Sequence, residues 1–143
     1  MTIALLDDHL LRDMVAQDVS PDLARVLAEH EIATTNLYLY RLSKSVVSAR
    51  GGALTGSWPS EHRRELGRRL LELAPSVQMV PIRAIAYHIA EIADAHRVST
   101  LGAEAAAAAE QLKATLYVWE GDHGPGIKGA VISVGAMYET VTR

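Results

Sequence analysis

The chain has 143 residues and a formal net charge of −3 at pH 7, and hydrophobic residues make up 49% of it. This composition predicts a single domain with an apolar core, and it argues against disorder and against binding nucleic acid through net charge. The sequence contains no cysteine, which excludes disulfides and thiolate metal sites. No apolar run reaches the length of a membrane span and the start has no leader pattern, so we expect a cytoplasmic protein without membrane association.

Short apolar runs alternate with segments of helical spacing along the chain. The runs predict strands over residues 2–6, 31–35, 77–80 and 115–119, with an edge strand over 137–141. The helical segments are expected over residues 10–17, 21–29, 36–50, 61–74, 81–96 and 103–112, with a short helix after Pro125. Ser20 and Ser60 are the expected N-caps of the helices that follow them. Residues 51–60 are rich in loop-forming residues and predict a mobile surface segment.

This alternation predicts a three-layer α/β/α fold, in which helices cover both faces of a central, mainly parallel sheet of four to five strands. Right-handed crossovers place the carboxyl ends of the strands at one edge, where open α/β sheets bind ligands. Acidic residues lie at or near the carboxyl ends of the predicted strands. Asp7 and Asp8 end the first strand, Glu120 and Asp122 follow the fourth, and Glu104 lies in the expected first turn of an Ala-rich helix.

Carboxylates that are brought together away from water repel one another, and a divalent cation removes that cost. Mg²⁺ and Mn²⁺ prefer oxygen ligands, lower the pKa of bound water and support phosphodiester hydrolysis. Each acid also has a structural explanation. Asp7 or Asp8 could cap the next helix, Glu104 could interact with a helix dipole, and Glu120 or Asp122 could belong to a simple turn.

The run LLDDHLL at residues 5–11 and the order of elements over residues 77–122 resemble the PIN domain family. In that family a strand ends in an Asp, a later acid opens an Ala-rich helix, and an acidic loop follows the next strand. The resemblance covers nearly the whole of a single domain spanning residues 1–143. It implies a metal-dependent ribonuclease, as in the VapC-type toxins of toxin–antitoxin pairs, with catalytic and metal-binding roles for Asp7, Glu104, Glu120 and Asp122. The implied cofactor is Mg²⁺ or Mn²⁺.

The same resemblance implies a homodimer, with RNA and an antitoxin or another protein as partners. The chain departs from the family in the helix after the second strand, where the family has a Glu. Residues 34–45 read TTNLYLYRLSKS and contain no acid, so Tyr40 or Arg41 stands in its place. Arg41 could pair with Asp7 or Glu104 and compete with a metal. A second hypothesis is therefore a degenerate, non-catalytic PIN-like module that binds RNA or a protein partner.

A third hypothesis is a small-molecule domain, which would need a deep apolar pocket at the same sheet edge. Near the acids, Tyr40, Arg41 and His9 are candidate substrate contacts. His9 could also meet His123 there, although a surface position is the simpler expectation for both than a zinc site. Trp58 either stacks on a base or covers the core.

One helix carries several arginines. We interpret them as a solvated face paired with neighbouring acids rather than as a grip on RNA phosphates. The residues concerned are Arg63, Arg64, Arg68 and Arg69, with Glu61, Glu65 and Glu72 as partners.

Overall fold

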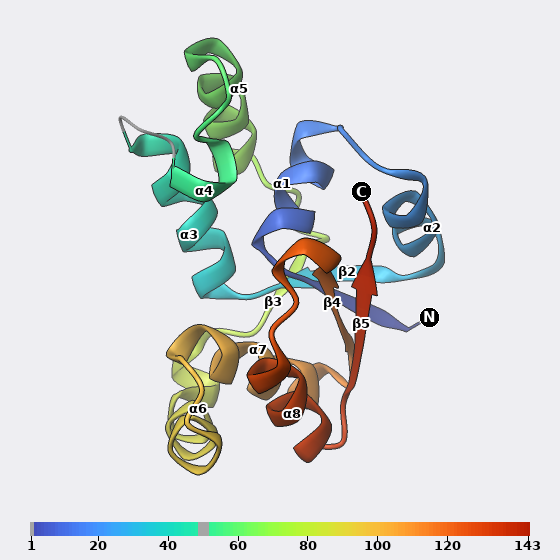
Figure 1. The fold of residues 1–143 in the computed structure, drawn as a ribbon, viewed down its shortest axis with the longest axis vertical. Helices are drawn as coiled ribbons and strands as arrows, with labels where there is room; N and C mark the ends of the chain where they lie inside the picture. Colours follow the sequence, from blue (N-terminus) through green and yellow to red (C-terminus); the bar gives the residue numbers. More distant parts are fainter. Residues whose placement is uncertain (1, 49–51) are drawn as a thin grey trace.

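The computed structural model describes residues 2–48 and 52–143. At its centre lies a five-stranded parallel sheet with the order β3-β2-β1-β4-β5 (Figure 1). The strands are β1 (Ile3–Leu6), β2 (Glu31–Thr34), β3 (Gln78–Met79), β4 (Thr115–Trp119) and β5 (Met137–Val141). The predicted α/β class is confirmed, and β5 is the edge strand that the sequence indicates.

Helices lie on both sides of this sheet (Figure 1). They are α1 (Asp8–Ala16), α2 (Pro21–Glu29), α3 (Asn36–Val47), α4 (Gly52–Thr55), α5 (Ser60–Leu71), α6 (Ile82–His96), α7 (Thr100–Leu112) and α8 (Pro125–Ser133), and a 3₁₀ turn, η1 (Glu120–Asp122), follows β4. In the described part of the chain, no helix is both long enough and apolar enough to cross a bilayer.

The alternation of side chains along β1 separates two cores. Leu5 faces the layer formed by α6, α7 and α8, whereas Ala4 and Leu6 pack with α1 and α2 on the other face. The three-layer arrangement follows from this division.

A third apolar cluster joins the outer side of α1 to α3, α4 and α5. Its buried members are Leu11, Leu42, Leu54 and Leu66. Trp58 packs against this cluster, and the Arg12 guanidinium lies 5.7 Å from the centre of its ring. Of the two roles considered for Trp58, the structure therefore shows the core-covering one.

Several element boundaries differ from the predictions. Part of the predicted loop over residues 51–60 is helical, because α4 covers Gly52–Thr55, and the predicted end of the preceding helix near residue 50 lies outside the described residues. The N-cap of α5 is Pro59 rather than Ser60. Helix α7 begins at Thr100, three residues early, because Ser99 caps it by accepting a hydrogen bond from the Gly102 amide. Glu104 consequently lies in the second turn of α7, not the first.

The strand order creates a switch point between β1 and β4. From β1 the chain adds β2 and then β3 on one side, and it later returns to add β4 and β5 on the other. Helices that leave the carboxyl ends of two such neighbouring strands diverge, and open α/β sheets bind ligands in the resulting crevice. Residues that follow β1 and β4 are therefore the first place to look for a site.

Candidate metal centre

Asp7, directly after β1, joins the start of α1 to the end of β4. Its side chain is buried and caps α1, because Oδ1 accepts a hydrogen bond from the Leu10 amide at 2.8 Å. Its Oδ2 accepts a second bond, at 3.0 Å, from the Trp119 amide. Burial raises the pKa of Asp7 to about 7, although these two hydrogen bonds oppose the shift. Asp7 thus fixes the geometry of the switch point.

Asp8 is the first residue of α1 and is fully buried. Its Oδ1 accepts a hydrogen bond from the His9 amide at 3.0 Å, and its Oδ2 lies 3.1 Å from a terminal nitrogen of Arg41. The Oδ2 atom forms no hydrogen bond of good geometry within the described residues, so Arg41 acts on it mainly through charge. Burial raises the pKa of Asp8 above its usual range, while the Arg41 guanidinium pulls it back.

His9 lies between α1 and the turn that follows β4. Its imidazole packs on Trp119, with ring centroids 4.7 Å apart, and its Nε2 is 3.6 Å from the Asp122 carboxylate. Its Nδ1 is buried and has no hydrogen-bond partner among residues 2–48 and 52–143. Burial lowers the pKa of His9 despite the nearby acids, which favours the neutral imidazole near pH 7. Neutral imidazole is the form that binds metal ions.

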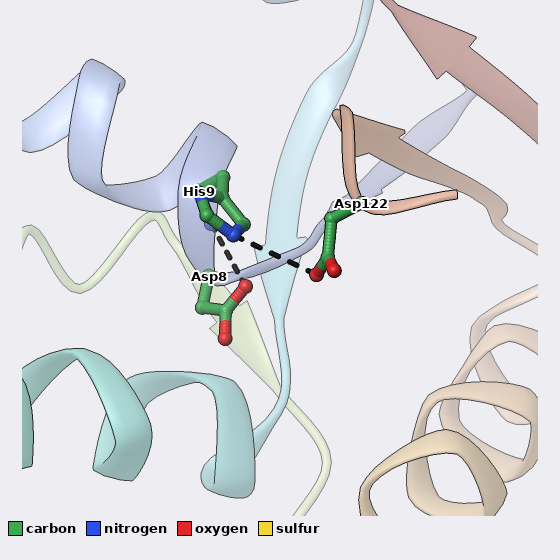
Figure 2. A group of neighbouring side chains, drawn as sticks. All are labelled: Asp8, His9 and Asp122. Carbon is green, nitrogen blue, oxygen red and sulfur yellow. Dashed lines mark hydrogen bonds and ion pairs between the residues drawn. The ribbon is translucent and has the colours of Figure 1, made fainter. Parts of the chain in front are cut away.

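Asp8, His9 and Asp122 form a compact group, which we call the edge triad. Figure 2 shows the carboxylate of Asp8 below the His9 ring and that of Asp122 to its right. Asp8 and His9 come from α1, and Asp122 comes from η1. One ligand atom from each residue lies within 4.8 Å of the other two. Asp122 is 55% exposed, so the group can be reached from solvent.

The donor set of the edge triad suits a divalent cation. Two carboxylates and one neutral imidazole match Mn²⁺ or Zn²⁺ better than Mg²⁺, which favours oxygen ligands alone. The Oδ2 atom of Asp8, which is buried and without a hydrogen bond in the described structure, is consistent with this. A cation would also offset the burial of Asp8.

Glu104 has another task. It is fully buried, and its Oε2 accepts hydrogen bonds from the Asn36 amide and side chain at 3.1 and 2.8 Å. Its Oε1 accepts a third from the Leu37 amide at 2.8 Å. Glu104 therefore caps the N-terminus of α3, where free N–H groups and the helix dipole favour a negative charge. These bonds explain why Glu104 is buried without any metal.

Of the other residues predicted for the site, two lie in or beside the edge triad and three do not take part in it. Asp122 belongs to the edge triad and Asp7 supports it. Glu120 is exposed, and its side chain makes no hydrogen bond or ion pair with a described residue. Tyr40 is 60% exposed on α3. His123 bonds the Tyr138 hydroxyl at 2.9 Å instead of meeting His9.

Arg41 does not pair with Asp7 or Glu104, the two partners considered for it. The oxygens of those acids already accept backbone N–H groups, and α3 brings Arg41 to the first turn of α1, where Asp8 lies. The sequence places Asp8 with Asp7 at the end of the first strand and offers it as a possible helix cap, but the resemblance gives the metal-binding role to Asp7 and not to Asp8. The signal that points to it is the position of the helix start, because a helix that begins at once after Asp7 carries Asp8 and His9 in its first turn.

The arginine-bearing face of α5 is paired only in part, because Arg68 and Arg69 contact acids. Arg63 instead donates to the Ser48 carbonyl oxygen at 2.7 Å, and neither Arg64 nor Glu61 forms an ion pair with a described residue. Arg68 contacts Glu65 at 2.6 Å and Glu72 at 3.1 Å, and Arg69 contacts Glu65 at 3.1 Å. Surface pairs of this kind add little stability, but they leave fewer free cations for phosphate groups.

Comparison with known proteins identifies a shared fold. No family model and no curated protein matches the sequence. The chain is similar to the crystal structure of PAE2754 from Pyrobaculum aerophilum, with a TM-score of 0.55 and 16% identity over 96% of this chain and 90% of that one.

Proposed function

We propose that this chain is a PIN-like ribonuclease that uses a divalent cation bound by Asp8, His9 and Asp122. The observation that carries the proposal is the convergence of these donors, from α1 and η1, at the switch point between β1 and β4. The resemblance of the sequence to PIN domains supports RNA as the substrate. The mixed donor set favours Mn²⁺ over Mg²⁺.

When bound, the cation supplies Lewis-acid stabilisation and a bound water of lowered pKa. The remaining tasks belong to the chain. Asp7 holds α1 against β4 and so keeps His9 facing Asp122. The half-exposed guanidinium of Arg41 lies beside the site and can donate to a phosphate oxygen. The exposed ring of Tyr40, the residue before it on α3, can stack on a base.

Two measurements test this proposal together: Mn²⁺ binding measured by calorimetry, and cleavage of single-stranded RNA. We expect Asp122→Asn to abolish both, because one of three ligands loses its charge. Glu120→Gln is the matched control: it changes an exposed acid two residues away that lies outside the edge triad. Cleavage that survives a chelator or the Asp122→Asn substitution would refute the proposal, and equal losses in both variants would refute the assignment of the ligands.

One observation favours the degenerate module as a second candidate. The Arg41 guanidinium already compensates the charge of Asp8, and Glu104 already accepts hydrogen bonds at the start of α3. These buried acids therefore have partners without a metal ion. This alternative predicts that the chain binds RNA without Mn²⁺ and does not cleave it. Fluorescence anisotropy measures the binding. If the chain is the toxin of a toxin–antitoxin pair, the first proposal also includes an antitoxin partner, a homodimer and a cytoplasmic location. Light scattering of the purified chain tests the dimer.

A further inference from the structure

Asp8 needs a positive partner. A fully buried carboxylate is costly unless a cation lies next to it, and within the described structure the Arg41 guanidinium fills that role at 3.1 Å. The charge of Asp8 thus depends on Arg41.

The contact between Arg41 and Asp8 is one that can open. Arg41 is 47% exposed, so its guanidinium keeps much of its hydration and can turn toward solvent. The contact lacks hydrogen-bond geometry at Oδ2. When another cation compensates the Asp8 charge, release of Arg41 costs little, because its guanidinium is rehydrated and its side chain regains conformational entropy. Separation of this pair is therefore cheap whenever another cation takes over Asp8.

The same carboxylate is one of the three donors of the edge triad. A divalent cation bound there would lie close to the Arg41 charge, and like charges at such distances repel strongly in a partly buried site. Either Arg41 moves away or the cation binds against its repulsion. Both cases make the affinity of the cation depend on Arg41.

We propose that Arg41 is a tethered competitor of the divalent cation, which occupies Asp8 until a cation displaces it and which sets the affinity of the site. This inference rests on the proposed function, since it assumes that the edge triad binds a cation. It assigns a role to Arg41, one of the two residues that could stand where the PIN pattern has an acid. The competitor and the cation exclude each other at Asp8, so removing the competitor should tighten cation binding.

The test is Mn²⁺ titration of the full chain by calorimetry at pH 8, where protons compete least for the carboxylates. We expect Arg41→Gln to bind Mn²⁺ about tenfold more tightly than the natural chain, and Arg41→Lys, which keeps the charge, to remain within about threefold of it. Lys44→Gln is the matched control, because it removes the same charge from an exposed position one turn further along α3. It should change the affinity less than twofold.

The outcomes separate this inference from the proposed function. If the natural chain binds Mn²⁺ and Arg41→Gln binds no more tightly than Lys44→Gln, Arg41 is no competitor, while the cation site stands. If none of the chains binds Mn²⁺, the cation site and the inference fall together. Thermal unfolding of each variant without metal shows whether it is folded, and an unfolded Arg41→Gln would be replaced by Arg41→Met under the same criteria.

Discussion

Glu104→Gln distinguishes a structural carboxylate from a metal ligand. In the structure, Glu104 accepts three hydrogen bonds from Asn36 and Leu37 at the N-terminus of α3. A glutamine keeps one acceptor oxygen and turns an NH₂ group toward at least one of these donors. Losing a hydrogen bond to a charged acceptor costs about 1.5–3 kcal/mol, and losing the negative charge at the helix terminus costs about 0.3–1 kcal/mol. We therefore expect a loss of about 2–4 kcal/mol.

Urea unfolding followed by tryptophan fluorescence, with a chelator present, measures this loss. A metal ligand behaves in the opposite way, because removing one acid from an unoccupied cluster relieves repulsion and leaves the metal-free protein at least as stable. Glu110→Gln, on the exposed side of the same helix, is the control and should cost less than about 1 kcal/mol. Equal stability of the two variants in the chelator would refute the capping role of Glu104.

Three further predictions concern stability. Burial raises the pKa of Asp7 from its ordinary value of 3.8 to about 7, so the stability that its protonated carboxyl gives the folded chain is full below about pH 4 and is lost as the pH rises through 7. The advantage of the natural chain over Asp7→Asn should thus shrink by about 2–3 kcal/mol between pH 5 and 8 in urea unfolding, and a constant difference would contradict the raised pKa. Gly102→Ala places a Cβ 2.7 Å from Cγ1 of Ile127 and should cost about 1–3 kcal/mol, whereas in the Ile127→Ala background, which lacks that atom, it should cost almost nothing in thermal unfolding. Arg12→Met removes a buried guanidinium that contacts Asp13 at 2.9 Å and donates to the Leu54 carbonyl at 2.7 Å. Asp13 keeps Arg143 at 2.9 Å as a second partner, so the substitution should cost about 1–3 kcal/mol in thermal unfolding, and an unchanged stability would contradict the role of Arg12.

The local signals in the sequence were sufficient for most of the fold. Ser20 followed by Pro21 marks the start of α2, and the structure has the Ser20 hydroxyl capping that helix. Helix α4 escaped prediction because its residues have loop-forming neighbours. It is held by contacts from elsewhere: Leu54 is buried in the third cluster, and the Thr55 hydroxyl lies 2.8 Å from that of Ser45. Such contacts leave no periodic trace in a sequence.

The candidate site, too, could be predicted from the sequence only in part. The placement of Asp7 and Asp122 at one edge follows from parallel strands and could be anticipated. The capping role of Glu104 could not, because the amides it accepts from are 67 and 68 positions away in the chain. The partner of Arg41 depends equally on how α3 packs against α1, and a residue count along the chain does not show which of several acids it meets.

The hydrogen bond from the Trp119 amide to Asp7 joins residues that are 112 positions apart, and Asp122 comes later still. A ribosome must therefore complete β4 and η1 before the donors carried by α1 can meet their third member. Pairings between such distant segments form late in folding, after the loop-closure cost has been met. Nascent and truncated chains that stop before residue 122 consequently lack the assembled centre, so any chemistry performed there is confined to molecules whose synthesis has passed that point.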